Sequence, residues 1–137
     1  MTEDFLDSHK RHWDDAERLF SVGRWANADH LYGISAECGL KGLLEKLQRA
    51  PLNGNQRRHI WESRKPGNCW SIFDAYRSGH VLAAKFPMPN NNPFNDWDIS
   101  QRYAHQSYFD RNRADSHRNG AEIIKGFVTT ADLEGLL

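Results

Sequence analysis

Residues 110–117, which read DRNRADSH, bring together side chains that can transfer protons and side chains that can bind phosphate. Arg111 and Asn112 precede His117 by six and five positions. A histidine, whose ordinary pKa is about 6.5, exchanges a proton readily near neutral pH. The planar guanidinium of an arginine donates several hydrogen bonds to phosphate oxygens, and an asparagine can orient either group. The pattern is therefore a candidate catalytic site formed by Arg111, Asn112 and His117.

These residue types suit the cleavage of RNA by its own 2′-hydroxyl group. That reaction needs a base for the hydroxyl proton, an acid for the leaving oxygen, and positive charge on the phosphorane-like transition state. Arg113 and Arg118 flank the motif and are candidate phosphate-binding residues, although Asp110 and Asp115 offset their charge. Because no step requires a metal, the pattern predicts neither a metal nor another cofactor.

The spacing between arginine and histidine is a weak signal when it is taken alone. In a chain of this composition roughly two matches are expected by chance, and this chain contains two. The second, Arg24 to His30, reads RWANADH. The plain alternative for either pair is an arginine at a helix end and a histidine packed inside a bundle. The sequence leaves that alternative open.

Four stretches with helical periodicity must position these residues. Breakers such as Gly23 and Pro51 separate them, and strand signals are weak. Short helices are expected near residues 57–63 and after Asp98, which forms a capping box with Gln101. The sequence predicts an all-α protein, an antiparallel bundle of four main helices with one or two short extra helices, in one domain over residues 1–137. The main helices are expected at about residues 3–22, 25–48, 69–86 and 110–131.

Two of these helices have faces that indicate how they pack. The helix at 25–48 contains small residues at close intervals, namely Gly33, Ser35, Gly39 and Gly42. Because glycine in a helix costs about 1 kcal/mol relative to alanine, this stripe favours the close approach of another helix. The last helix has an apolar inner stripe that includes His117, together with Ala114, Ala121, Ile124, Phe127 and Val128.

Residues 25–44, WANADHLYGISAECGLKGLL, resemble the second helix of HEPN domains, where an alanine-rich stretch leads into an A-E-x-x-x-K-x-L-L pattern. The helix order is also similar, with a final helix that bears an arginine, a polar residue and a histidine. On this resemblance Arg111, Asn112 and His117 occupy the family's active positions. The resemblance implies a metal-independent endoribonuclease with a toxin, defence or RNA-processing role. The residues that match the pattern of the second helix are Ala36, Glu37, Lys41, Leu43 and Leu44.

The resemblance also implies partners. RNA is the expected substrate, and a homodimer is expected because one histidine cannot act as base and acid in a single concerted step. The family also contains catalytically silent members that bind nucleotides or scaffold other proteins. A non-catalytic nucleotide-binding or protein-interaction module, paired with an antitoxin or a nucleotidyltransferase, is therefore the alternative.

Several polar residues are candidates for a supporting role around the motif. Glu37 and Lys41 stand four apart, so they form either an exposed salt bridge or a pair that supports Arg111 or His117 from the neighbouring helix. Residues 96–104, DWDISQRYA, look like a segment that precedes the motif in some prokaryotic members. Further supporting candidates in and after that segment are Arg102, Tyr103 and His105.

Composition and the remaining motifs limit the classes of protein and partner that we expect. The formal net charge is +0, which argues against a protein that holds nucleic acid by its overall charge. His9 and His12 are interpreted as surface histidines, and Cys38 and Cys69 as small buried or semi-buried thiols in a reducing compartment. There is no glycine-rich phosphate loop and no apolar run near the ~20 residues of a membrane span. We expect a soluble cytoplasmic protein without contact to a membrane.

Overall fold

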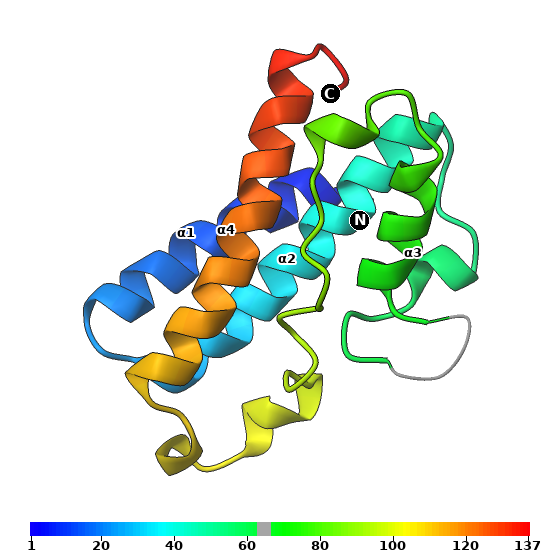
Figure 1. The fold of residues 1–137 in the computed structure, drawn as a ribbon. Helices are drawn as coiled ribbons and strands as arrows, with labels where there is room; N and C mark the ends of the chain where they lie inside the picture. The colour runs from blue at the N-terminus through cyan, green and yellow to red at the C-terminus, as the bar shows by residue number, and fades with distance from the viewer. Residues whose placement is uncertain (63–66) are drawn as a thin grey trace.

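Four α-helices and four short 3₁₀ helices make up the computed structural model, which describes residues 1–62 and 67–137 (Figure 1). Within these residues there is no β-strand, so the predicted all-α class is confirmed. The α-helices are α1 (Phe5–Ser21), α2 (Trp25–Gln48), α3 (Cys69–Ser78) and α4 (Arg111–Leu133). The 3₁₀ helices are η1 (Asn55–Arg57), η2 (Ala83–Lys85), η3 (Ile99–Tyr103) and η4 (Gln106–Tyr108).

The third helix is the element whose length differs most from the prediction. Asn68 caps its start as expected, because its side chain accepts a hydrogen bond from the backbone N–H of Ser71. The helix ends at Ser78 before Gly79, whereas the apolar pattern continued to residue 86. Of the later apolar residues, Phe86 is buried just after η2, whereas Val81 is exposed. The short helix expected near residues 57–63 is not found at residues 58–62, because η1 ends at Arg57, and Ser63 lies outside the described residues.

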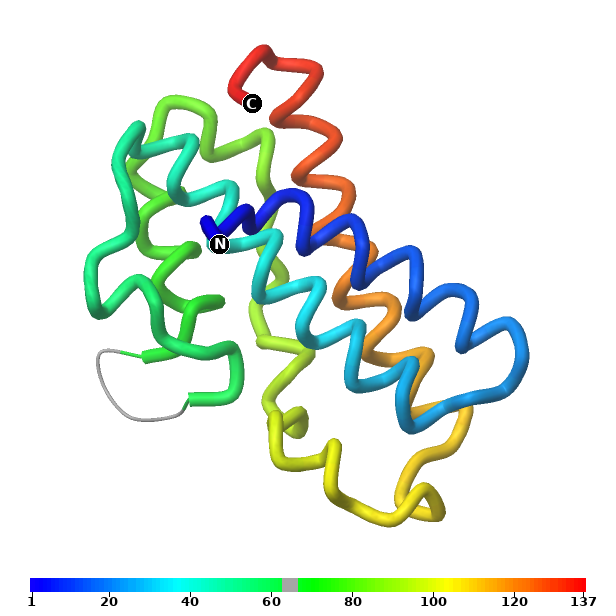
Figure 2. The backbone as a smooth tube through the Cα atoms, turned by 180° about the vertical axis from the view of Figure 1, so that it is seen from behind, coloured from blue at the N-terminus to red at the C-terminus, as the bar shows by residue number. Residues whose placement is uncertain are grey.

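A tight turn at Gly23 joins α1 to α2 and makes them antiparallel neighbours. Gly23 has a φ of 76°, a left-handed conformation that glycine adopts without strain. The backbone N–H groups of Gly23 and Arg24 donate to the carbonyls of Phe20 and Leu19 and so close the end of α1. In contrast, α4 runs in the same general direction as α2, because the chain between them returns to the end of the bundle where α2 begins (Figures 1 and 2).

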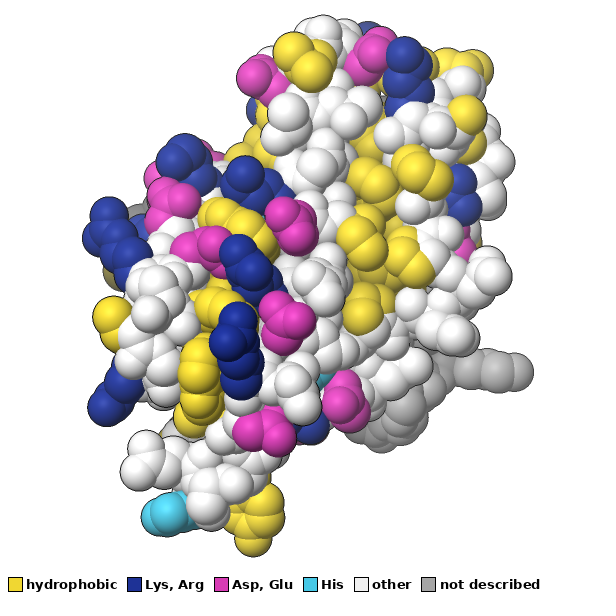
Figure 3. Space-filling model, turned by 60° about the vertical axis from the view of Figure 1, so that its left-hand side comes forward, with side chains coloured by type: hydrophobic (Ala, Val, Ile, Leu, Met, Phe, Trp, Pro, Cys, Tyr) yellow, Lys and Arg dark blue, Asp and Glu magenta, His cyan; other side chains and the backbone are white. Residues whose placement is uncertain are grey.

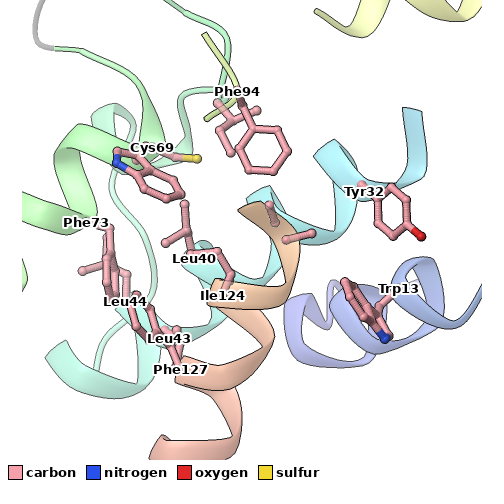
Figure 4. Close-up of a cluster of buried hydrophobic side chains, with 14 of the residues drawn as sticks. Trp13, Tyr32, Leu40, Leu43, Leu44, Cys69, Phe73, Phe94, Ile124 and Phe127 are labelled. Atoms are coloured by element: carbon pink, nitrogen blue, oxygen red, sulfur yellow. The ribbon is translucent and has the colours of Figure 1, made fainter. Parts of the chain in front are cut away.

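The core lies where α2 contacts α1, α3 and α4 (Figure 4). The expected close approach at the small residues of α2 is confirmed at Gly39. A Cβ atom there would lie 2.5 Å from Ile124 of α4 and 2.8 Å from the ring of His9 of α1. Gly33 has a different neighbour, because a Cβ atom there would lie 2.0 Å from the indole of Trp97. Trp97 belongs to the irregular chain before α4.

The chain between α3 and α4 crosses the bundle as an extended segment (Figure 1). Buried aromatic side chains hold this segment in place. The indole N–H of Trp97 donates to the carbonyl of Asp29 at 3.1 Å. The predicted capping box of Asp98 and Gln101 is confirmed at the start of η3. This segment therefore has a fixed position on α2, and it places Asp96 beside α4. The buried aromatic residues that hold it are Phe86, Phe94, Trp97 and Phe109.

Candidate functional site

His117 lies inside the bundle, between α2, α4 and the extended segment. Its side chain is 1% exposed, and its ring stacks on Phe94 with a centroid distance of 5.4 Å. The Nδ1 atom is hydrogen bonded to Oδ1 of Asp29 on α2. The Nε2 atom lies 2.8 Å from Oδ1 of Asp96. Both ring nitrogens of His117 are therefore occupied by carboxylates of the same chain.

An arginine completes this group. Arg113 donates to Oδ2 of Asp96 at 3.2 Å and to the backbone carbonyl of the same residue, and its Nε atom lies 3.8 Å from Oδ2 of Asp29. Gln101 donates a further hydrogen bond to Asp29. We call Asp29, Asp96, Arg113 and His117 the polar cluster. With His117 protonated, two positive and two negative charges balance within it.

The polar cluster changes the pKa of two of its members. Burial by itself lowers the pKa of His117, but the hydrogen bond and charge of Asp29, and then those of Asp96, outweigh burial and raise the pKa above 6.5. Partial burial raises the pKa of Asp96, yet its hydrogen bond to His117 and the charges of His117 and Arg113 hold the pKa below its usual value. Both shifts favour an imidazolium between carboxylates.

Arg111 and Asn112 do not join His117 in the single chain. Both are exposed in the first turn of α4, and the guanidinium of Arg111 lies 5.9 Å from the ring centre of Phe20. A helix turns by about 100° per residue, so six positions separate two side chains by about 120° around the axis. Arg113 is four residues before His117, which is about 40°, and it is the arginine that reaches the polar cluster.

Arg118, the other candidate phosphate ligand, is already paired with a carboxylate. It donates to both carboxylate oxygens of Glu17 on α1, at 2.7 and 3.0 Å, and its guanidinium lies 4.9 Å from the ring centre of Phe20. The hydrogen bond from Arg118 lowers the pKa of Glu17, which also accepts a hydrogen bond from the hydroxyl of Tyr32 at 2.7 Å. Arg118 thus links α4 to α1.

Glu37 and Lys41 form an ion pair, but the pair is neither the exposed salt bridge nor the support for Arg111 or His117 that the sequence suggests. The pair is buried, with side chains 10% and 7% exposed, so it is not an exposed salt bridge. Beyond Lys41, the Glu37 carboxylate accepts from the backbone N–H of Ile60 and contacts the ring of His59 at 2.9 Å. No interaction among the described residues joins the pair to Arg111 or to His117. The carboxylate of α2 that supports His117 is Asp29.

The other supporting candidates lie on the exposed η3 and η4. The guanidinium of Arg102 stacks over the ring of Tyr103, at 4.8 Å from its centre. The ring of His105 accepts a hydrogen bond from the backbone of Ser107 and caps η4. None of Arg102, Tyr103 and His105 contacts His117 within the described part of the chain. Within η3, Gln101 reaches the polar cluster through its hydrogen bond to Asp29.

The histidines near the N-terminus are not both on the surface. The expectation is wrong for His9, which is 2% exposed and lies 2.8 Å from the backbone carbonyl of Ser35 on α2. Burial lowers the pKa of His9. In residues 1–62 and 67–137 no group of three or more histidine, cysteine or acidic side chains is placed to hold a metal ion. The cysteines agree with the prediction, since Cys69 is buried and Cys38 is half-buried.

Sequence reasoning did not identify Asp29 and Asp96. For Asp29 a signal was present, because it lies on the same face of α2 as Tyr32, Ala36 and Leu40, all of which are buried. An acidic residue within an apolar face needs a partner, and a buried histidine on a neighbouring helix is one such partner. Asp96 lies in a non-periodic segment, so the pattern gave no signal for it.

No protein-family model, curated protein or solved structure matches this chain. Among the helices that the structure describes, none has both the length and the apolar character that a membrane crossing requires.

Proposed function

We propose that this chain is a metal-independent endoribonuclease of HEPN type in which His117 transfers a proton to the RNA. The proposal starts from the resemblance of residues 25–44 and from the arginine–histidine motif, and one observation supports it. A fully buried carboxylate, Asp29, orients His117 at Nδ1, whereas Nε2 faces Asp96, whose side chain is 66% exposed. General acid or base catalysis needs such a ring, fixed at one nitrogen and close to the surface at the other.

The proposed reaction moves two protons and exchanges one bond at phosphorus. The 2′ oxygen of the RNA bonds to the adjacent phosphorus, and the bond from phosphorus to the 5′ oxygen of the next nucleotide breaks. The raised pKa of His117 suits it to donate its Nε2 proton to that 5′ oxygen. In the proposed homodimer, the proton of the 2′-hydroxyl goes to the neutral imidazole of His117 in a second copy. The products are a 2′,3′-cyclic phosphate and a 5′-hydroxyl end.

Substrate binding has to replace one contact of the polar cluster. In this proposal a phosphate oxygen takes the place of the Asp96 carboxylate on Nε2 of His117. Arg113, which donates to Asp96 in the free protein, then donates to the phosphate. Arg111 and Asn112 are exposed in the same first turn of α4 and contact a neighbouring phosphate in this proposal.

One observation favours the alternative, a non-catalytic module that binds a nucleotide or a protein such as an antitoxin or a nucleotidyltransferase. In the single chain His117 is buried with both nitrogens occupied, and Arg111 lies on another side of α4. On this view the polar cluster is a structural tie that holds the segment before α4 on the bundle. The alternative predicts a bound nucleotide or protein partner and no turnover of RNA.

Cleavage of single-stranded RNA in the presence of EDTA tests the proposal. Wild type is compared with His117→Gln, Arg111→Ala and Lys46→Ala, the last being an exposed cation at the far end of α2. We expect cyclic phosphate ends from wild type and from Lys46→Ala, with a loss of about 10²–10⁴-fold in His117→Gln. Far-UV circular dichroism checks that each variant is folded. Equal cleavage by all four proteins indicates a contaminant and refutes the proposal.

A further inference from the structure

A groove separate from the polar cluster lies at the end of the bundle where α2 and α4 begin. It has a volume of about 390 Å³ and is formed between the α1–α2 turn and the chain that carries η4. Its walls mix hydrogen-bonding, charged and aromatic side chains. They include Arg24, Trp25, Asn27, Gln106 and Phe109.

One exposed arginine lines this groove, and two more lie close to groove residues along the chain. Arg24 lines it, and Arg102 lies in η3, which leads into the groove residue Ala104. Arg111 follows the groove residue Phe109 by two positions, and its guanidinium lies over Phe20, which packs edge-on against Trp25 of the groove at 5.1 Å.

These arginines keep their charge available to a ligand. Among the described residues, no carboxylate lies within ion-pair distance of Arg24, Arg102 or Arg111. The acidic residues of the same segment, Asp98 and Asp110, accept hydrogen bonds from the backbone at the starts of η3 and α4. Elsewhere, on the face that brings α1 forward, basic and acidic side chains are intermixed (Figure 3). The positive charge of these three arginines is therefore not neutralised by an ion pair with a described residue.

Exposed aromatic rings lie beside these cations. Tyr108 stands in the chain between the groove residues Gln106 and Phe109 and is 75% exposed, and Tyr103 is 78% exposed. Each ring presents a face on which a nucleic-acid base can stack. Rings next to unpaired arginines are the combination that binds single-stranded nucleic acid, because bases stack on the rings while guanidinium groups contact phosphates.

We propose that this groove binds a single-stranded stretch of RNA, with its phosphates on Arg24 and Arg111 and a base stacked at Tyr108. The inference rests on the proposed RNA substrate, and it extends the binding surface from Arg111 of the arginine–histidine motif to residues outside that motif. A duplex does not fit this site, because its bases are stacked on each other and offer no free face. The groove would hold the strand beside the polar cluster.

Binding to a fluorescein-labelled 2′-O-methyl single strand, followed by fluorescence anisotropy, separates binding from cleavage. The substituted RNA has no 2′-hydroxyl nucleophile, so it stays intact. Each phosphate contact adds about −0.7 to the slope of log K against log salt, so the two arginines give about −1.4, a roughly sevenfold loss between 50 and 200 mM salt. Arg24→Ala makes the slope shallower by about 0.7, and Tyr108→Ala weakens binding at least about fivefold. Lys46→Ala, the matched charge change at the far end of α2, leaves binding unchanged.

The outcomes distinguish this inference from the proposed cleavage. Unchanged binding in both Arg24→Ala and Tyr108→Ala overturns the inference, and so does equal binding of a duplex of the same sequence. Absence of any binding by wild type overturns it as well. If wild type binds the strand through Arg24 and Tyr108 but does not cleave ordinary RNA, the groove assignment stands and the catalytic proposal fails.

Discussion

Replacement of Asp29 by asparagine tests whether the polar cluster depends on a buried charge pair. Asp29→Asn keeps the size of the side chain and one oxygen, but it removes the negative charge at Nδ1 of His117. The side chains of both residues are almost completely inaccessible, at 0% and 1% exposed. The imidazolium then retains only Asp96 as a charged partner, and that carboxylate is largely in water.

The cost follows from the burial of the pair. Removing one partner of a buried ion pair destabilises a protein by about 3–5 kcal/mol, and the retained oxygen places this substitution near about 3 kcal/mol. That is a large part of the about 5–15 kcal/mol by which native proteins are stable. For a chain of this length we expect the melting temperature to fall by about 10 °C. Asp132→Asn, an exposed change in the last turn of α4, should alter stability by less than about 0.5 kcal/mol.

The effect should also depend on pH, with a sign fixed by the pKa shift of His117. Because the folded-state pKa of His117 is raised, its stabilising contribution is complete below the unfolded value of about 6.5 and is lost as the pH rises through the folded value. The difference in unfolding free energy between wild type and Asp29→Asn should therefore be larger at pH 6 than at pH 9.

Urea unfolding followed by far-UV circular dichroism at these two pH values measures the difference. An NMR titration of the ring protons of His117 checks the cause, because the pKa of His117 should fall in Asp29→Asn. A loss below about 1 kcal/mol at pH 6, or an equal loss at both pH values, contradicts a charged pair at this position. In that case His117 is neutral in the fold and cannot be the proposed acid.

Three further predictions concern other parts of the fold. Gly33→Ala should destabilise the protein by about 1–3 kcal/mol, because the new Cβ atom would lie 2.0 Å from the rigid indole of Trp97; Gly126→Ala, with open space around it, should stabilise α4 by up to about 1 kcal/mol in the same denaturation assay. Lys41→Met should cost about 3–5 kcal/mol by leaving its buried carboxylate partner without a cation, and a loss below about 1 kcal/mol would argue against the pair. Burial raises the pKa of the Cys38 thiol to about 12, so iodoacetamide at pH 8 should modify it much more slowly in the native protein than in urea, as mass spectrometry can follow.

Helical periodicity was sufficient to predict the helices that carry a continuous apolar face. The bounds of α2 are the predicted ones, Trp25–Gln48, because its pattern is continuous and Gly23 separates it from α1. The end of α3 was misplaced because Val81, Leu82 and Phe86 extend an apolar pattern although the helix stops before Gly79. Periodicity records which side chains are apolar, but it does not say which of them are buried: Phe86 packs in the core from outside any helix, whereas Val81 is 95% exposed.

The segment before α4 could not be predicted in the same way. It is held by aromatic side chains that enter the core without a period, and by the indole of Trp97 lying against Gly33. Such a contact depends on how two distant parts of the chain fit together in space. The local sequence of either part therefore does not predict it. Asp96 reaches His117 only because this segment lies where it does, which is why the site was incomplete at the level of sequence.

Two sequence patterns that include His117 predict different orientations for its side chain. It belonged to the apolar stripe of the last helix, and it also completed a motif with Arg111. In the structure His117 faces the core with the rest of the apolar stripe, since Ala114 and Ala121 on the same face are buried with it. Helix geometry alone separates Arg111 from His117 by about 120° and brings Arg113 to within about 40°. The motif describes spacing along the chain, whereas a single-chain site requires a shared face.

The contrast between the two carboxylates decides what the polar cluster can do. Water and salt screen the charge of an exposed ion-pair partner, so its contribution is smaller than that of a fully buried partner. The Asp96 side chain is 66% exposed, so exchanging it at Nε2 for a phosphate oxygen should cost little. The Asp29 side chain is fully buried, and its loss at Nδ1 leaves a buried charge without compensation. A ligand can therefore compete for one nitrogen of His117 while the other stays fixed, and this asymmetry is what a proton-transferring histidine requires and a purely structural tie does not.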